Sequence, residues 1–167
     1  MENERAAEEA GTVDVRARAH MLAGENCALS LLNAFVDDPR VGPGVEPAVG
    51  LGLGGGFGGS GALCGAVNAA GLLLGAAVGA RGAVTCGNES KVGQRAVNEA
   101  VSRLRRDFCM RYGSCDCTPI LKGKPKLSPR KPWCAELVAW TAAWLDRELG
   151  PGAAGTTGTA GADAAAE

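Results

Sequence analysis

Cysteine is the residue type in this sequence with the most chemistry to offer. The chain of 167 residues holds seven cysteines and a single histidine. Its acidic beginning, MENERAAEEA, lacks the apolar stretch of a secretory signal, so we expect a reducing, cytoplasmic location. Permanent disulfides are rare there and the count is odd. Cysteines kept under these conditions are more often catalytic, metal-binding or redox-sensing than structural.

Three of the cysteines fall near the expected starts of helices. Cys27 follows Asn26, a favourable helix cap, and Cys134 follows Pro132. Cys64 lies near the beginning of a run of small residues. The unpaired N–H groups and partial positive charge at a helix start stabilise a thiolate and lower the thiol pKa. The pattern therefore predicts thiolate chemistry.

The elements that must position these cysteines are predicted to be helices. Aromatic residues make up 4% of the chain and Ile occurs once, which argues against a large sheet. Apolar residues recur at helical spacing. We therefore expect an all-α fold, a small bundle of about four to five helices. The predicted helices cover residues 2–23, 26–36, 62–80, 88–112 and 133–149.

The segments between the helices have unusual compositions. Eight of the twelve residues in 50–61 are Gly, which predicts a loop shaped by its backbone. Residues 118–132 hold four Pro and five Lys or Arg, which is typical of an extended connector. Residues 150–167 offer almost nothing to bury, so we expect a disordered tail after a single helical domain of residues 1–149.

An uncharged run from residue 47 to residue 80 raises the alternative of a membrane helix. Gly71, Gly75 and Gly79 have the small-xxx-small spacing of packed membrane helices. The run is nevertheless diluted by Gly, contains Asn68, and lacks flanking aromatic residues or an initial Lys/Arg cluster. We favour a tightly packed helix inside a bundle and expect no membrane span.

Other functional classes find little support. The net charge of −1 gives the chain no general attraction to nucleic acid, so we expect no such partner. The GGGFGG run matches a dinucleotide fingerprint only by virtue of its glycine content, with no strand before it. His20 lies in a plain helical segment without a hydrolase motif around it, so it is expected to be a surface or packing residue.

Five short motifs follow one another along the chain. They are Asn26-Cys27-Ala28, Gly56-Phe57-Gly58-Gly59, Cys64-Gly65-Ala66-Val67, Gly113-Ser114-x-x-Cys117 and Cys134-x-x-x-Val138. In this order they resemble the redox-active C-GCAxxG-C-C proteins, which are small bacterial proteins with four characteristic cysteines. The resemblance covers about residues 10–149, and the motif's final Gly is Ala69 here.

The resemblance implies a redox site made of Cys27, Cys64, Cys117 and Cys134. Such a site would use thiol–disulfide or electron-transfer chemistry with a redox partner that the sequence does not identify. The same four cysteines are also candidate ligands, because all-cysteine sets hold zinc or an iron–sulfur cluster. Their long spacings would require ligands from separate elements. Whether the protein is an enzyme, and whether it forms a homodimer, stays open.

The remaining cysteines and the basic connector suggest weaker alternatives. Cys86 and Cys109 are interpreted as incidental thiols, and Cys115 forms a C-x-C pair with Cys117 that could chelate a metal or form a strained disulfide. A non-catalytic helical module that binds an anionic partner is the alternative function. Its contacts would come from the connector residues Lys122, Lys124, Lys126, Arg130 and Lys131.

Overall fold

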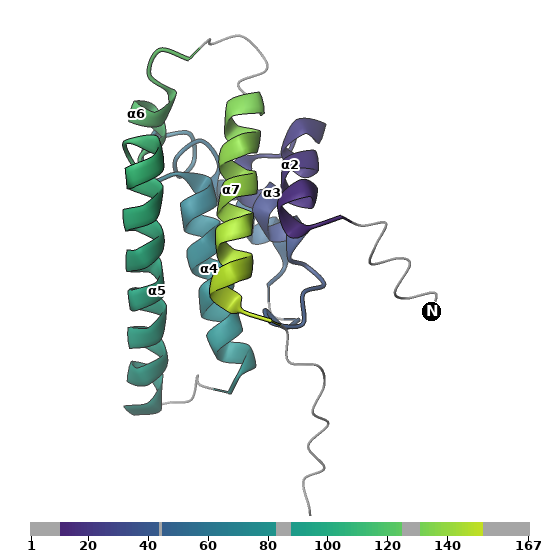
Figure 1. The fold of residues 1–167 in the computed structure, drawn as a ribbon, viewed down its shortest axis with the longest axis vertical. Coiled ribbons are helices and arrows are strands. Elements are labelled where there is room, and N and C mark those ends of the chain that lie inside the picture. The colour runs from purple at the N-terminus through teal and green to yellow at the C-terminus, as the bar shows by residue number, and fades with distance from the viewer. Residues whose placement is uncertain (1–10, 44, 83–87, 125–130, 152–167) are drawn as a thin grey trace, which may run out of the picture.

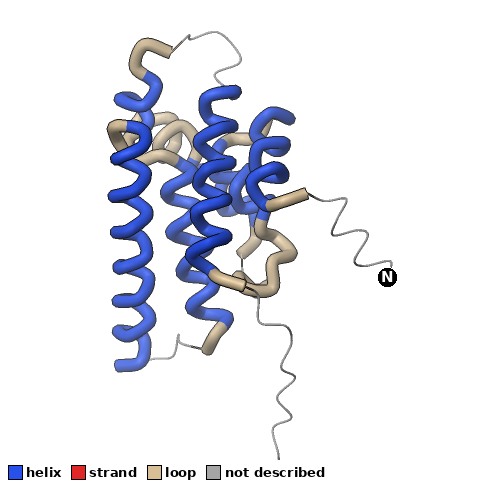
Figure 2. Tube along the Cα trace, viewed as in Figure 1, coloured by secondary structure: helices blue, strands red, loops and turns tan. Residues whose placement is uncertain are grey.

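The computed structural model describes residues 11–43, 45–82, 88–124 and 131–151, and these residues form an all-α fold. Figure 2 shows helices joined by loops, and the only β pairing within the described ranges is an isolated antiparallel bridge between Leu63 and Asp116. The all-α prediction is confirmed, although the helices outnumber the predicted four to five. They are α2 (Val13–Ala23), α3 (Cys27–Ala34), the 3₁₀ helix η1 (Pro47–Leu53), α4 (Gly65–Ala80), α5 (Asn88–Tyr112), α6 (Cys117–Leu121) and α7 (Lys131–Leu149).

Residues with special backbone preferences set several helix ends where the sequence predicts them. Gly24 adopts a φ of 118°, a left-handed conformation that ends α2. Asn26 caps α3, because its side-chain oxygen accepts hydrogen bonds from the N–H groups of Ala28 and Leu29, each at 2.9 Å. Gly113 has a φ of 79° and follows the last residue of α5.

The segments predicted to be loops contain additional helical turns. The connector prediction for residues 118–132 is wrong at its beginning, where α6 continues to Leu121. Pro119 is compatible with this turn, because the first turn of a helix needs no N–H from proline. Pro47 likewise begins η1 inside the uncharged run. The structure of residues 125–130 lies outside the described residues.

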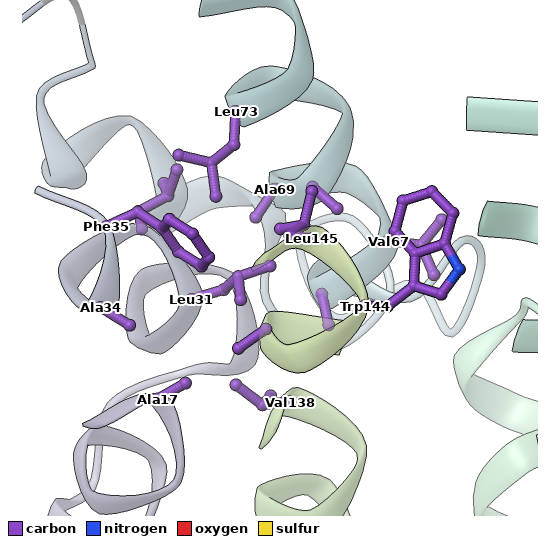
Figure 3. Packing of buried hydrophobic residues seen from close by; sticks show 14 of the residues in the cluster. Ala17, Leu31, Ala34, Phe35, Val67, Ala69, Leu73, Val138, Trp144 and Leu145 are labelled. Carbon is purple, nitrogen blue, oxygen red and sulfur yellow. The ribbon is translucent and has the colours of Figure 1, made fainter. Parts of the chain in front are cut away.

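Helix α7 is packed against α2, α3 and α4, while α5 packs mainly on α4. In Figure 1, α4, α5 and α7 run side by side along the long axis, and α4 and α7 both begin at the end where α6 lies. Figure 3 shows the core, where Leu31 and Phe35 from α3 and its end meet Leu73 of α4 and Leu145 of α7. These four side chains are at most 1% exposed. Apolar burial of this kind is the main force that holds the helices together.

Helix α4, the small-residue helix, lies within this bundle. It packs against α3, α5 and α7, as predicted for a closely packed helix. In the part of the chain that the structure describes, every helix is too short or too polar to cross a membrane. Trp144 is buried in the core, and its indole N–H donates to Asp107 Oδ2 at 3.0 Å. Residues 152–167 of the predicted tail lie outside the described residues.

Candidate four-cysteine site

One cavity of about 810 Å³ brings together the four cysteines that the family resemblance singles out. Cys27 begins α3, Cys64 precedes α4, Cys117 begins α6 and Cys134 lies in the first turn of α7. All four belong to its wall, which also includes Gly55, Gly59 and Gly61 of the glycine loop and Lys122 and Lys124 of the connector. Four residues separated by up to 107 positions in sequence thus face one space.

Cys27 occupies the first position of a capped helix. Asn26 holds this position in two ways, because its Oδ1 caps α3 and its Nδ2 donates to the carbonyl oxygens of Gly50 and Leu51, both at 3.3 Å. The cap therefore joins the helix start to the segment that leads into the glycine loop. The Cys27 side chain is buried, with 9% of its surface exposed.

Cys27 and Cys64 form a hydrogen-bonded pair. The hydrogen bond from Cys64 lowers the pKa of Cys27 to about 6, against the opposing effect of burial and with help from the backbone at Gly55 and Gly65. The same hydrogen bond, together with burial and the neighbouring charge, raises the pKa of Cys64 far above the usual thiol range. A proton is therefore lost more readily from Cys27 than from Cys64.

Two glycines near these sulfurs, Gly65 and Gly54, lie where a larger side chain would have no room. A Cβ atom on Gly65 would lie 2.6 Å from Cys27 Sγ and 2.7 Å from the Leu53 carbonyl oxygen. A Cβ on Gly54 would lie 2.8 Å from Cβ of Asn26, the cap of α3. By contrast, Gly75 has no neighbouring atom within 4 Å of such a Cβ. The close approach expected from the glycines along α4 thus occurs at Gly65, next to Cys64.

Cys117 reaches the cavity through a short pairing between two loops. The Cys64 N–H donates to the Cys115 carbonyl oxygen and the Cys117 N–H donates to the Ala62 carbonyl oxygen, both at 2.8 Å. The Thr118 N–H adds a third bond of 2.9 Å to Gly61. Gly61 has a φ of 80°, and a Cβ there would collide with the Thr118 hydroxyl. These bonds hold the start of α6 against the segment before α4.

Lys124 of the connector lies near the start of α7. The Lys124 ammonium is 3.8 Å from the centre of the Trp133 ring, a cation–π contact beside Cys134 in sequence. Cys117 and Cys134 are both half-buried. Lys122 and Lys124 are the described members of the predicted basic set whose side chains line the cavity. Lys126 and Arg130 lie outside the described residues, as does the side chain of Lys131.

The four cysteines do not form a compact metal-binding group. Throughout the described ranges, no group of three or more His, Cys, Asp or Glu side chains is placed to hold a metal ion. The four cysteines share a cavity, but their positions do not fit the compact ligand set of a zinc site or an iron–sulfur cluster.

A second cysteine pair, which the sequence reading did not anticipate, lies outside the cavity wall. Cys109 Sγ is 2.6 Å from Cys115 Sγ. The sequence reading grouped Cys115 with Cys117 and treated Cys109 as incidental. Gly113, which lies between the two cysteines in sequence, indicates that the chain turns back at the end of α5, and this turn could have predicted the pair. Cys86 lies outside the described residues.

A comparison with known protein families identifies the family of this chain. Residues 25–148 match the family described as "Putative redox-active protein (C_GCAxxG_C_C)". The chain belongs to this family. No curated protein and no solved structure matches the chain. Membership in the C_GCAxxG_C_C family confirms the resemblance and supports a redox-active protein.

The structure explains why the C_GCAxxG_C_C motif has these residue types. Its central segment, Cys64-Gly65-Ala66, supplies the cysteine that hydrogen-bonds to Cys27, the glycine that leaves space for the Cys27 sulfur, and a fully buried alanine. Ala69 stands at the motif's final glycine and is also fully buried. Figure 3 shows Ala69 within the core. The site therefore tolerates a methyl group there, in contrast to Gly65.

Proposed function

We propose that this protein carries out thiol–disulfide redox chemistry, with Cys27 as the attacking residue and Cys64 as the resolving residue. The observation that carries the proposal is the placement of Cys27 and Cys64 together in the cavity wall, where the interaction with Cys64 lowers the pKa of Cys27 to about 6. A thiolate is the form of cysteine that attacks disulfides. A second buried thiol beside it can complete the exchange.

The exchange requires an external disulfide, written R–S–S–R. The Cys27 thiolate attacks one sulfur, so that a Cys27–S–S–R bond forms and RS⁻ leaves. Cys64 transfers its proton to the departing thiolate and then attacks the Cys27 sulfur. The second RS⁻ leaves, and a Cys27–Cys64 disulfide remains. The two cysteines lose two electrons, which the external disulfide gains as one RSH and one RS⁻.

The cavity suggests the class of the external reactant. Its wall includes the cationic side chains of Lys122 and Lys124, and among the described residues no Asp or Glu takes part in it. A positive wall favours an anionic disulfide or thiol over a cationic one. The basic connector residues thereby serve the redox reaction, and we propose that Cys117 and Cys134 take part in it from the same cavity.

The proposal is tested by titrating the reduced protein with oxidised glutathione, an anionic disulfide, and mapping the bonds that form. Trypsin places Cys27 and Cys64 in separate peptides, residues 19–40 and 41–81. We expect these two peptides to become linked, and expect the link to be lost in Cys27→Ser and Cys64→Ser but kept in Cys86→Ser. If both thiols remain fully alkylatable at every glutathione ratio, the proposal is wrong.

A metal-based electron-transfer function is separated from this proposal by elemental analysis. Protein purified without oxygen is assayed for iron, sulfide and zinc. We expect less than one equivalent of each, together with four reactive thiols in the cavity set. A stoichiometric cluster or zinc ion bound through these cysteines would contradict the thiol mechanism. The cytoplasmic location also stays a prediction, which fractionation of the source cells would test.

A further inference from the structure

The Cys109–Cys115 pair is the strongest chemical feature that the four-cysteine site leaves unexplained. The two sulfurs are 2.6 Å apart, and neither residue belongs to the cavity wall. A disulfide bond is about 2.05 Å long, so a small side-chain rotation would bring the two atoms to bonding distance. The pair is therefore already arranged for oxidation, without movement of a helix.

The local sequence explains why these two residues meet. The Gly113 N–H donates to the Cys109 carbonyl oxygen at 2.8 Å, and the positive φ of Gly113 reverses the chain at the end of α5. The Ser114 hydroxyl then accepts a 3.0 Å hydrogen bond from the Asp116 N–H, which tightens the following turn. Cys115 consequently folds back onto Cys109.

The two thiols differ in their access to solvent. Cys109 is half-buried, whereas Cys115 is 6% exposed and its sulfur also contacts the carbonyl oxygen of Arg105 at 3.4 Å. Burial and the neighbouring Cys109 raise the pKa of the Cys115 thiol to about 11. Cys109 is thus the member that an external reagent reaches first, and Cys115 is the inner member.

We propose that Cys109 and Cys115 form a second redox site, which a low-molecular-weight disulfide oxidises to an intramolecular disulfide. Cys109 loses its proton to solvent and attacks one sulfur of R–S–S–R, which releases RS⁻ and leaves a Cys109–S–S–R bond. Cys115 gives its proton to a released thiolate and attacks the Cys109 sulfur, which releases the second RS⁻. The two cysteines lose two electrons and two protons overall, and two RSH molecules form.

The proposed disulfide would act on the four-cysteine site through the backbone. The Cys115 carbonyl oxygen accepts the Cys64 N–H at 2.8 Å, and the Cys117 N–H two residues later donates to Ala62. A bond from Cys115 to α5 fixes the segment that makes these contacts. Oxidation of the second site therefore strengthens the attachment of the Cys117 segment to the residues around Cys64.

The experiment titrates the full-length reduced protein with mixtures of reduced and oxidised glutathione, followed by alkylation and trypsin digestion. Trypsin cleaves after Arg111, which separates Cys109 in peptide 107–111 from Cys115 in peptide 112–122. We expect the two peptides to become linked. The link should persist in Cys117→Ser and disappear in Cys115→Ser, where Cys109 should instead retain a glutathione adduct.

Hydrogen exchange tests whether the disulfide affects the four-cysteine site. Two thiols that lie close together without such an effect would leave the exchange rates at that site unchanged. In oxidised protein we expect the amides of Cys64 and Cys117 to exchange several-fold more slowly than in reduced protein. Cys109→Ser in the same oxidised buffer should show no such slowing, which separates this effect from oxidation of Cys27 and Cys64. Circular dichroism checks that each variant folds, and Cys115→Ala replaces Cys115→Ser if the latter loses helix.

Two results would overturn the proposal. One is a cross-link that survives in Cys115→Ser and is lost in Cys117→Ser, because Cys109 would then bond to Cys117. The other is the absence of the 107–111 to 112–122 link under conditions that fully link peptides 19–40 and 41–81. The second result leaves the proposed function of Cys27 and Cys64 intact, so the two hypotheses fail independently.

Discussion

At the scale of single residues, Cys27 and Cys64 differ in pKa: that of Cys27 is lowered and that of Cys64 is raised. The backbone around Gly55 and Gly65 favours charge on Cys27, while burial and the Cys27 charge disfavour it on Cys64. A helix start alone would act on either cysteine. In the proposed reaction, the interaction between the two thiols makes Cys27 the nucleophile, so both sulfurs must be present.

The first prediction concerns the pH dependence of Cys27 alkylation. Only the thiolate reacts, so the rate should fall as the pH drops through about 6 and stay high up to pH 8. Cys64→Ala removes the hydrogen-bond donor and should move the midpoint upward, toward or above the ordinary thiol value. The rate is measured by mass spectrometry of peptide 19–40 after iodoacetamide treatment. An unchanged midpoint in Cys64→Ala would show that Cys64 does not set the Cys27 pKa.

At the scale of elements, glycine and one asparagine determine how closely the segments approach. Gly54 packs against Asn26, Gly61 packs against Thr118, and Gly65 packs against Cys27. The Gly61 and Gly65 contacts each join two segments that carry different cysteines, and the Gly54 contact joins the glycine loop to the cap of α3. The glycine loop therefore allows the segments around the site to approach closely, because its residues lack side chains and can adopt tight turns.

The second prediction uses two glycines of α4 as a matched pair. Gly65→Ala forces a methyl group against Cys27 Sγ and the Leu53 carbonyl, and should lower the free energy of unfolding by about 1–3 kcal/mol. Gly75→Ala meets no atom within 4 Å and should raise it by roughly 0.5–1 kcal/mol, because alanine favours a helix. Urea unfolding measures both. Equal effects of the two substitutions would contradict the proposed packing.

The third prediction separates the two roles of Asn26. Asn26→Ala removes the helix cap and should cost about 1 kcal/mol of unfolding free energy. Asn26→Asp keeps an oxygen for the cap but loses the donors to Gly50 and Leu51 and places a negative charge beside Cys27. It should therefore raise the pKa of Cys27 relative to wild type, as measured by the alkylation profile. A lowered Cys27 pKa in Asn26→Asp would refute this account.

At the scale of the whole molecule, Arg40 ties the chain after α3 to the end of α7. Its guanidinium contacts Asp38 at 2.6 Å, Asp146 at 2.7 Å and the Gly150 carbonyl at 2.8 Å. Burial alone would raise the pKa of Asp38, but hydrogen bonds and charge from Arg40 hold it below its usual range. This cluster joins the segment after α3 to the end of α7, at the opposite end of α7 from Cys134.

The fourth prediction tests this connection. Arg40→Lys cannot reproduce the planar set of contacts and should lower the unfolding free energy by about 1–3 kcal/mol at pH 7. Because the folded-state pKa of Asp38 is lowered, its contribution is present above about pH 4 and is lost as the pH falls through the folded value. The difference between variant and wild type should shrink accordingly.

The control for Arg40 is Arg106, an exposed residue paired with its neighbour Asp107. Arg106→Lys should change the unfolding free energy by no more than about 0.5 kcal/mol, because exposed ion pairs contribute little. Urea unfolding at several pH values measures both variants. A loss at Arg106 as large as that at Arg40 would mean that general charge effects, and not the buried contacts, determine the result.

The sequence by itself determined the helical fold and the identity of the candidate cysteines. Gly24, Asn26 and Gly113 mark helix ends through preferences that belong to the residues themselves, so the structure agrees with the sequence there. The family motif likewise named the four cysteines that meet in one cavity. The helix preferences of residues and the order of motifs are properties of the sequence alone, so both can be recognised before the fold is known.

Only the tertiary structure decided which sulfurs are neighbours. Cys27 meets Cys64, and Cys109 meets Cys115 in preference to the adjacent C-x-C partner. The helix α6 formed inside a segment whose composition is typical of a connector, because loop pairing holds its start. Such contacts depend on the path of glycine-rich loops. Glycine accepts many backbone angles, so its presence in the sequence allows those paths without specifying any one of them.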